Sequence, residues 1–329
     1  MKFAVLVGPS DTLGYVYAQG RMAELDKISR LSPIQIEPEK FAAHEALLSE
    51  VQVIFTTWGF PSITAKQLDR LPKLEAVFYA AGSVQSFARP LVERGIKVVS
   101  AWRGNGVPVA EFTLAQILLA CKGYNHNVRD FKSGAPHHSA SRGPGVYGET
   151  VALLGFGAIG QVLRDLLRGF NLKFVVFDPF LSEEAAAEAD VRKVTLEEAF
   201  ATGYVVSNHL ANKPETVGMI NEALLARMRP GATFINTGRG ATVVEGDLAT
   251  VMAKRRDLTA LLDVTDPEPV SPQSPLMQLP NIVITTHIAG SINDEVVRLA
   301  DYCIEDYKRF VAGVPMVNEV TLEMLATMA

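Results

Sequence analysis

The sequence predicts an α/β protein built on two parallel sheets, each covered by helices on both faces. Short runs rich in β-branched and aromatic residues alternate with longer amphipathic segments from one end of the chain to the other. The alternation occurs before residue 150 and again after it, and 329 residues are enough for two domains that each bury a core. We therefore expect two doubly wound parallel-sheet domains.

The first third of the chain contains several of these strand-like runs. Helix-like segments at Glu39–Glu50 and Thr64–Leu71 lie among them, as parallel strands require crossover connections. Strands are expected at Phe3–Val7, Ile34–Ile36, Val51–Thr56, Leu74–Ala80 and Ile96–Val99.

The remaining two thirds begin with a predicted helix at Ala110–Asn125 and a Gly-, Pro-, Ser- and His-rich surface loop at Lys132–Gly148. His137 and His138 in that loop have no third ligand at a useful spacing, so no metal site is expected. Further strands are expected at Val151–Leu154, Phe174–Phe177, Tyr204–Ser207, Ala232–Ile235, Thr259–Leu262 and Ile282–Thr285. Near the end, an apolar helical face should cover part of a core; it consists of Val296, Val297, Ala300, Ile304, Tyr307 and Val311.

Composition excludes several classes of protein. Hydrophobic residues make up 48% of the chain, too many for a disordered protein, and the net charge of −5 comes without a basic stripe that would bind nucleic acid. The N-terminal apolar run is too short for a signal peptide, and no uninterrupted apolar stretch is long enough to span a membrane. Cys121 and Cys303 lie in apolar segments without metal-ligand spacing, so we expect buried reduced thiols and a cytoplasmic protein.

The strongest local motif is Gly155-Phe156-Gly157-Ala158-Ile159-Gly160. It follows the predicted strand Val151–Leu154 and begins a helix-like segment at Gln161–Phe170. The next predicted strand ends at Asp178, 18 residues after Gly160. A GxGxxG pattern alone is weak, but this context of strand, helix and acidic residue is typical of a dinucleotide site.

Each residue type in this motif has a physical role. Gly155 permits a tight turn, Gly157 lets the backbone approach a pyrophosphate, and Gly160 lets the helix lie close to the strand. The first amides of the helix are positioned to bind the phosphates. Asp178 is expected to accept hydrogen bonds from the ribose and to repel a 2′-phosphate, which favours NAD over NADP.

Polar side chains follow three later predicted strands at the point where each ends. Arg239 follows Ala232–Ile235, Glu268 follows Thr259–Leu262, and His287 follows Ile282–Thr285. Ligands bind beyond the carboxyl ends of the strands in open parallel sheets, so these side chains are expected near the cofactor. Any one of them has an ordinary structural explanation; three in successive strand-end loops favour a catalytic set.

The chemistry of the three side chains is complementary. An arginine grips a carboxylate with two hydrogen bonds, and a histidine donates a proton to an oxygen near neutral pH. A neighbouring glutamate orients the histidine ring and favours its charged form. Beside a nicotinamide, this set suits reversible hydride transfer between a 2-keto acid and a 2-hydroxy acid.

With these motifs, the chain resembles the D-isomer-specific 2-hydroxyacid dehydrogenases over nearly its whole length. The resemblance rests on the motifs VALLGFGAIGQ, VVSNHLANKPETVGMI, INTGRG, LDVTDPEP and TTHIAG, which occur in the order of that family. It implies that Arg239 binds the substrate carboxylate, that His287 is the acid–base residue, and that Glu268 is its partner. It further implies cofactor contacts by Asp178, by the nicotinamide-contacting Asp263, by Thr237 and Gly238, and by the loop Val205–Leu210 with His209.

The resemblance also implies an architecture. A flavodoxin-like substrate-binding domain, expected at 1–102 plus 290–329, is interrupted by a Rossmann NAD-binding domain at 103–289. Members commonly form dimers through the cofactor domain, so a homodimer is expected. The implied partner is a small 2-keto or 2-hydroxy acid, with no nucleic acid, membrane or metal.

The sequence departs from the family where the substrate should bind. A family loop that holds the substrate carboxylate reads Ala80-Ala81-Gly82-Ser83-Val84-Gln85 here, without the acidic residue of the family pattern. Ser83 and Gln85 either hydrogen-bond substrate or finish a turn. Trp58 and Phe60 either form an apolar wall for the substrate or pack beneath their loop. Ala81, Gly82, Ser83 and Trp58 are the substrate-binding candidates, together with Arg239.

The favoured function is therefore NAD-dependent reduction of a small 2-keto acid such as glyoxylate or hydroxypyruvate. Two alternatives stay open, because related proteins use this fold differently. One is an NAD(H)-sensing binding protein of the corepressor type, against which the lack of long extensions argues. The other is phosphonate oxidation. Formate oxidation is disfavoured because formate-oxidising relatives replace the glutamate with glutamine, whereas this chain has Glu268.

Overall fold

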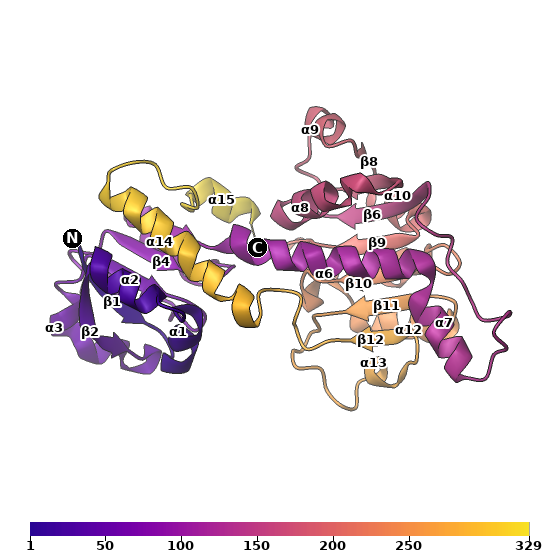
Figure 1. The fold of residues 1–329 in the computed structure, drawn as a ribbon, viewed down its shortest axis with the longest axis horizontal. Helices are drawn as coiled ribbons and strands as arrows, with labels where there is room; N and C mark the ends of the chain where they lie inside the picture. The colour runs from indigo at the N-terminus through magenta and orange to yellow at the C-terminus, as the bar shows by residue number, and fades with distance from the viewer. Residues whose placement is uncertain (329) are drawn as a thin grey trace. The chain divides into compact units, whose positions relative to one another are not determined.

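The computed structural model describes residues 1–328 and divides into two compact units. Unit 1 comprises Met1–Gly106 and Ser291–Ala329, and unit 2 comprises Val107–Gly290. Each unit contains one sheet in which all strand pairs are parallel, with helices packed on both faces (Figure 1). This arrangement confirms the predicted α/β class.

The sheet of unit 1 has the strand order β2-β1-β3-β4-β5, which is the flavodoxin-like order. Its strands are β1 (Phe3–Val7), β2 (Arg30–Ile36), β3 (Val53–Thr56), β4 (Ala76–Tyr79) and β5 (Lys97–Ser100). The direction in which successive strands are added reverses between β1 and β3. Such a reversal opens a crevice at the carboxyl ends of the strands, where ligands bind in sheets of this kind.

Two apolar layers enclose this sheet. One face packs against α1, α2 and α14, which contribute side chains such as Leu13, Leu25 and Tyr307. The other face packs against α5, α15 and the short helices between β2 and β4. These elements are α1 (Ser10–Val16), α2 (Arg21–Ile28), the 3₁₀ helix η1 (Pro38–His44), α3 (Glu45–Leu48), α4 (Ala65–Leu68), α5 (Ala88–Glu93), η4 (Asn293–Glu295), α14 (Val297–Val311) and α15 (Leu322–Thr327).

The sheet of unit 2 has the order β12-β11-β10-β9-β6-β7-β8, so its direction of addition reverses between β6 and β9. This is the Rossmann order with one further strand at an edge. The strands are β6 (Glu149–Leu154), β7 (Leu172–Phe177), β8 (Arg192–Lys193), β9 (Val205–Asn208), β10 (Thr233–Asn236), β11 (Thr259–Leu262) and β12 (Ile282–Ile284).

Helices α6, α8 and α9 cover one face of this sheet, and α10 to α13 cover the other (Figure 1). Helix α6 begins in unit 1 and continues into unit 2. The helices are α6 (Trp102–Lys122), α7 (Tyr124–Lys132), α8 (Ala158–Leu166), η2 (Leu167–Gly169), α9 (Glu183–Glu188), α10 (Leu196–Thr202), α11 (Glu222–Leu225), η3 (Gly240–Thr242), α12 (Glu245–Lys254) and α13 (Pro275–Gln278).

Three details differ from the expected elements. The helix expected at Ala110–Asn125 ends at Lys122, because Gly123 adopts a left-handed φ of 70° and a new helix starts after it. The first half of the helix expected at Glu39–Glu50, as far as His44, is 3₁₀, and only Glu45–Leu48 is α-helical. Val311, expected on the buried face of the last long helix, is 46% exposed, because it lies in the final turn, past the edge of the core.

Both cysteines are buried and unpaired with one another, as predicted. Burial raises the pKa of the Cys121 thiol to about 11, so it stays protonated at neutral pH. Among residues 1–328, no helix is long and apolar enough to cross a membrane. In the same residues, no cluster of three or more His, Cys, Asp or Glu side chains is arranged to hold a metal ion.

Candidate active site

The loop after β10 holds Arg239 through a network of buried amide and hydroxyl groups. Asn236 Oδ1 accepts hydrogen bonds from Gly238 N at 3.1 Å and from Asn208 Nδ2 at 3.0 Å. The Arg239 carbonyl accepts from Thr242 Oγ1 at 2.7 Å. These bonds connect the loop to β9 and to the following 3₁₀ turn, which fixes the backbone from which the Arg239 side chain projects.

The Arg239 guanidinium is mostly buried, but few of its N–H groups donate hydrogen bonds. Nη1 donates to its neighbour's carbonyl, Gly238 O, at 2.8 Å, and within residues 1–328 it makes no ion pair. Burial lowers the pKa of Arg239, and the nearby Glu268 carboxylate opposes that shift. Because arginine stays charged in proteins, the remaining donors present a cationic fork suited to a carboxylate ligand.

Gly240 brings the Arg239 loop into backbone contact with the loop that follows β11. A Cβ atom at Gly240 would lie 2.1 Å from the carbonyl carbon of Thr265 and 2.6 Å from Asp266 N. No side chain fits at that distance. The last glycine of the INTGRG motif thus sets the spacing between the loops that carry Arg239 and Glu268.

Asp263, at the carboxyl end of β11, holds the loop that follows β12. Its Oδ1 accepts from Thr285 Oγ1 at 2.6 Å and from Ile288 N at 2.8 Å, and its Oδ2 accepts from Ala289 N at 2.9 Å. The side chain is almost fully buried. Resemblance to the family predicts a nicotinamide contact for Asp263; the structure adds a positioning role that sequence reasoning did not find.

His287 lies on the segment that Asp263 holds, and its ring meets Glu268. Nδ1 of His287 is 2.6 Å from Oε1 of Glu268, and about half of each side chain is exposed. The backbone of His287 has a left-handed φ of 59°, an uncommon conformation for a residue other than glycine. Since Glu268 occupies Nδ1, the second ring nitrogen, Nε2, is available to a ligand.

The predicted cofactor residues His209 and Thr237 belong to one polar chain. His209 Nε2 lies 2.9 Å from Ser207 Oγ, and Nδ1 lies 3.4 Å from Thr237 Oγ1. Thr237 Oγ1 is in turn 3.3 Å from Thr113 Oγ1 on α6. Burial lowers the pKa of His209 to about 4, so its ring is neutral at physiological pH.

The glycine motif lies where the order of the unit 2 sheet reverses. Gly155 has a left-handed φ of 91°, and a Cβ atom there would lie 2.9 Å from His209 O on the adjacent strand end. A Cβ at Gly160 would lie 2.6 Å from Gly155 O, so only glycine lets α8 approach the turn. At Gly157 the space is open, and no side chain caps the amides that begin α8, including those of Ala158 and Ile159. This cradle fits a dinucleotide pyrophosphate.

Asp178 is fixed beside this turn. Its Oδ2 accepts from Phe156 N, inside the glycine motif, at 2.7 Å, and its Oδ1 accepts from Phe180 N at 2.8 Å. Each carboxylate oxygen has a further lone pair, so the Asp178 carboxylate is held in place and can still accept hydrogen bonds from a ligand. The negative charge is therefore held at the end of β7, where a ribose is expected.

The substrate-binding candidates of unit 1 also lie at strand ends. Trp58 follows β3, and Ala81, Gly82 and Ser83 follow the neighbouring strand β4. The Ala81 and Gly82 carbonyls both accept from Ser100 Oγ, at 3.0 and 2.5 Å, which fixes that turn. Trp58 is half-buried and packs against the apolar layers on both sides of the sheet.

Two neighbouring residues have structural roles. Phe60 is 8% exposed and packs edge-on against Phe87, with ring centroids 4.9 Å apart, so it lies beneath the loop. Gln85 Nε2 donates to the carbonyls of Leu325 and Met328, at 3.0 and 2.8 Å, and thereby ties the C-terminal helix to this loop. The residues 57–61 and 80–87 of these two loops include no lysine or arginine.

Comparison with known proteins agrees with the motifs. Residues 114–289 match the family model for the NAD binding domain of D-isomer specific 2-hydroxyacid dehydrogenases. The chain is 30% identical over 296 residues to a D-3-phosphoglycerate dehydrogenase from Archaeoglobus fulgidus, covering 89% of this chain and 56% of that protein. It is also 30% identical over 268 residues to a glyoxylate reductase from Korarchaeum cryptofilum, covering 80% of this chain and 81% of that protein.

This chain thus spans about half the length of the curated phosphoglycerate dehydrogenases that it matches. Among solved structures, a phosphoglycerate oxidoreductase from Rhizobium etli superimposes with a TM-score of 0.82 at 22% identity, covering 99% of this chain and all of that one. At that identity the likeness establishes the two-sheet fold and nothing finer.

Proposed function

The chain belongs to the D-isomer-specific 2-hydroxyacid dehydrogenase family, and we propose that it transfers a hydride between NAD(H) and a small 2-keto or 2-hydroxy acid. One observation carries the proposal. Arg239 and the hydrogen-bonded pair Glu268–His287 extend from the carboxyl ends of three neighbouring strands, in the unit that carries the glycine cradle. When bound, NADH supplies the hydride, and the protein supplies the proton and the charge.

The proton is assigned to His287. With Nδ1 held by Glu268, Nε2 donates to the carbonyl oxygen during reduction and accepts the hydroxyl proton in the reverse direction. Glu268 fixes the ring orientation and stabilises the imidazolium that the oxidation direction creates. The position of His287 depends on Asp263, which binds the two amides that follow it.

Arg239 is assigned to the substrate carboxylate. Its guanidinium fork orients the acid with two charge-assisted hydrogen bonds and stabilises negative charge that develops on the neighbouring carbonyl oxygen. In unit 1, the proposed substrate-binding residues are Trp58, Ala81, Gly82 and Ser83. The Asp178 carboxylate supports NAD in preference to NADP, because a 2′-phosphate would meet its negative charge.

The favoured substrates are glyoxylate and hydroxypyruvate. Trp58 is apolar, and the absence of lysine and arginine from residues 57–61 and 80–87 leaves these loops without a cation for a phosphate group. This composition supports a small uncharged substituent on the 2-keto acid. Replacement of Trp58 by Ala should therefore change the ratio of kcat/KM between small and large 2-keto acids.

The direct test follows NADH and NADPH oxidation with glyoxylate, hydroxypyruvate, pyruvate and phenylpyruvate, and NAD reduction with 3-phosphoglycerate. We expect fast NADH turnover with one or two of the small acids and little with the phosphorylated one. The His287→Ala variant should lose turnover by orders of magnitude while NADH binds nearly as before. Tight NADH binding without turnover of any acid would refute the dehydrogenase proposal and favour an NAD(H)-sensing protein.

We further propose that the protein acts in the cytoplasm as a homodimer that contacts its partner copy through unit 2. Family resemblance supports the dimer, as do the large exposed side chains Phe131 and Tyr147 of that unit, which are 60% and 85% exposed. The two free thiols support a reducing compartment. Light scattering coupled to gel filtration, on wild type and on Phe131→Ser, measures the mass and tests the interface.

A further inference from the structure

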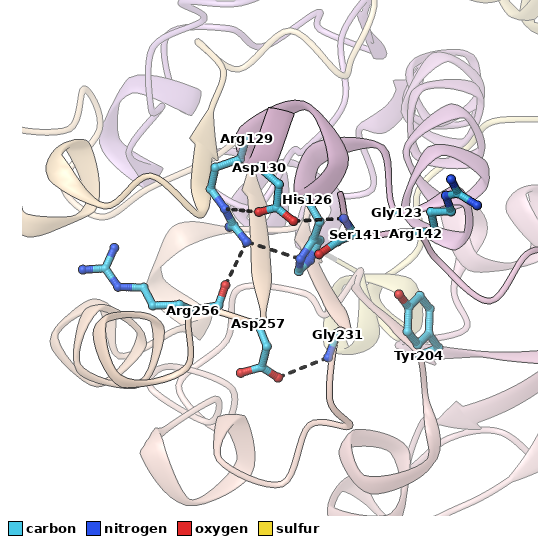
Figure 2. A pocket seen from close by; sticks show the side chains of 10 residues that line it. All are labelled: Gly123, His126, Arg129, Asp130, Ser141, Arg142, Tyr204, Gly231, Arg256 and Asp257. Atoms are coloured by element: carbon cyan, nitrogen blue, oxygen red, sulfur yellow. Dashed lines mark hydrogen bonds and ion pairs between the residues drawn. The ribbon is translucent and has the colours of Figure 1, made fainter. Parts of the chain in front are cut away.

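Unit 2 contains a hollow at the edge of the sheet where the strands begin. Tyr204, Gly231 and Asp257 line it, and they precede β9, β10 and β11 respectively (Figure 2). The volume of the hollow is about 460 Å³. Arg239, Glu268 and His287 follow the opposite ends of strands in the same sheet, so this hollow is separate from the candidate active site.

The wall opposite the strands is held rigidly. A Cβ atom at Gly123 would lie 2.4 Å from Gly143 N, and one at Gly143 would lie 2.2 Å from Cys121 O, so the segment around Gly143 lies directly on the junction of α6 and α7. Gly143 N donates to Lys122 O at 3.0 Å. Ser141 N donates to Asp130 Oδ2, also at 3.0 Å. These backbone contacts fix this wall of the hollow.

His126 presents an unused donor in this hollow. The side chain is 7% exposed, and Nδ1 lies 3.4 Å from Nη2 of Arg129. Arginine only donates, so Nδ1 must be the acceptor and the proton of the neutral ring is on Nε2. Burial and Arg129 both lower the pKa of His126, which keeps the ring neutral. Nε2 is buried and has no partner within residues 1–328, so an N–H donor awaits an acceptor.

The charge around the hollow is positive. Asp257 is neutralised by Arg255, which donates to both of its oxygens at 2.8 Å, and Asp130 is paired with Arg129 at 3.9 Å. Arg142 and Arg256 line the hollow, are exposed, and make no ion pair within residues 1–328. Figure 2 shows their guanidinium groups on opposite sides of His126. The negative charges of Asp257 and Asp130 are thus neutralised by neighbouring arginines. The positive charges of Arg142 and Arg256 remain without a counterion within residues 1–328.

We propose that this hollow binds the oxyanion of a small molecule, a phosphate or a carboxylate, with one oxygen accepting from His126 Nε2. Arg142 and Arg256 close over the anion from its two sides. Neither arginine holds an ion pair that must first be broken, although Arg256 Nε gives up its hydrogen bond to Ala253 O, at 3.2 Å, when the side chain reaches inward. Tyr204, whose ring lines the hollow, offers its hydroxyl to a second oxygen or to the rest of the ligand.

The test uses the full chain labelled with ¹⁵N in its six histidines. Inorganic phosphate and malonate are titrated separately, with chloride holding the ionic strength constant. We expect the free protein to show a neutral His126 with the proton on Nε2, and one of the two anions to move that resonance saturably. The signal is assigned by its loss in His126→Gln, and by its response to Arg129→Lys if that variant does not fold.

Matched variants separate this site from others. Arg142→Gln with Arg256→Gln should raise the apparent Kd for the anion roughly tenfold or more, since two charge-assisted contacts are lost. Arg227→Gln removes another exposed charge, elsewhere in unit 2, and should leave the Kd unchanged. Arg239→Gln should leave the His126 response intact, whatever it does to turnover, so this inference and the proposed function fail independently.

Saturation by phosphate alone would identify a phosphate site, and saturation by malonate alone a carboxylate site. The inference is wrong if neither anion moves the His126 resonance at up to about 50 mM, well above a millimolar Kd. It is equally wrong if chloride produces the same change, or if the double variant binds as tightly as wild type. Calorimetry with the same anions and variants provides a second readout.

Discussion

The hydroxyl of Thr285 donates to the Asp263 carboxylate at 2.6 Å, and this contact joins the ends of two neighbouring strands. Asp263 also accepts from the amides of Ile288 and Ala289. One buried carboxylate therefore binds the residues on both sides of His287. The proposed acid–base residue, His287, is thus positioned by a carboxylate with which its own ring makes no hydrogen bond within residues 1–328.

Replacement of Asp263 by Asn should lower kcat by roughly 10²-fold or more and reduce the free energy of unfolding by about 2–3 kcal/mol. The asparagine side chain has the same shape as aspartate. Its NH₂ group, however, would face hydroxyl and amide donors, with which it forms no hydrogen bond. Steady-state kinetics and urea unfolding measure the two effects. Asp266→Asn, at an exposed position in the same loop, is the control and should change neither. Wild-type kcat in Asp263→Asn would remove the positioning role.

Replacement of Asp178 by Ala should lower the preference for NADH over NADPH by roughly 10–100-fold. The substitution removes the charge that opposes a 2′-phosphate, and it also releases the Phe156 and Phe180 amides, so NADH affinity should fall as well. Cofactor fluorescence gives both dissociation constants without turnover. Asp165→Ala, on the exposed side of α8, is the matched control. An unchanged ratio would show that Asp178 does not select the cofactor.

Sequence patterns predicted both sheets and the strand ends from which the candidate site projects, because hydrophobic periodicity is a local property. The break at Gly123 was not predictable in the same way. It depends on the close approach of Gly143, which is twenty residues further along the chain, and on the hydrogen bonds that segment makes. The two-residue strand β8 is too short to leave a pattern.

The residues of the candidate site were found by motif and resemblance, but their supports were not. Thr285, Asn208 and Thr113 are ordinary strand or helix residues in the sequence, and only the fold shows that their side chains meet Asp263, Asn236 and Thr237. The same holds for Gln85, whose two hydrogen bonds go to the C-terminal helix. Asparagine at the ends of two consecutive strands, as at Asn208 and Asn236, is a local signal that could have indicated such a network.

Gly240 offers a test of the spacing between the Arg239 and Glu268 loops. Gly240→Ala places a Cβ 2.1 Å from the Thr265 carbonyl carbon, which is backbone and cannot rotate away. We expect kcat/KM to fall at least roughly 10²-fold and the free energy of unfolding to fall by about 2–4 kcal/mol. Gly246→Ala on α12 meets no atom within 4 Å and should stabilise the protein by about 0.5–1 kcal/mol. Equal behaviour of the two variants would contradict the close approach.

His209 should make the stability of the protein depend on pH in the acid range. Its pKa is about 4 in the folded protein because of burial, against about 6.5 in the unfolded chain. Between these values the unfolded state binds more protons than the folded state, so the free energy of unfolding falls as the pH falls from about 6.5 to about 4. The stability contributed by the neutral ring is fully present above pH 6.5.

The His209→Gln variant should therefore lose less stability between pH 7 and pH 5 than wild type, by on the order of 1–2 kcal/mol. Glutamine keeps a polar group that can hydrogen-bond Ser207, but it does not titrate. Any loss of stability caused by the substitution itself is therefore the same at both pH values. Urea unfolding at the two pH values measures the difference. His137→Gln, in the exposed loop, should keep the wild-type dependence. Parallel curves for His209→Gln and wild type would mean that the His209 ring accepts a proton as readily in the folded protein as in the unfolded chain.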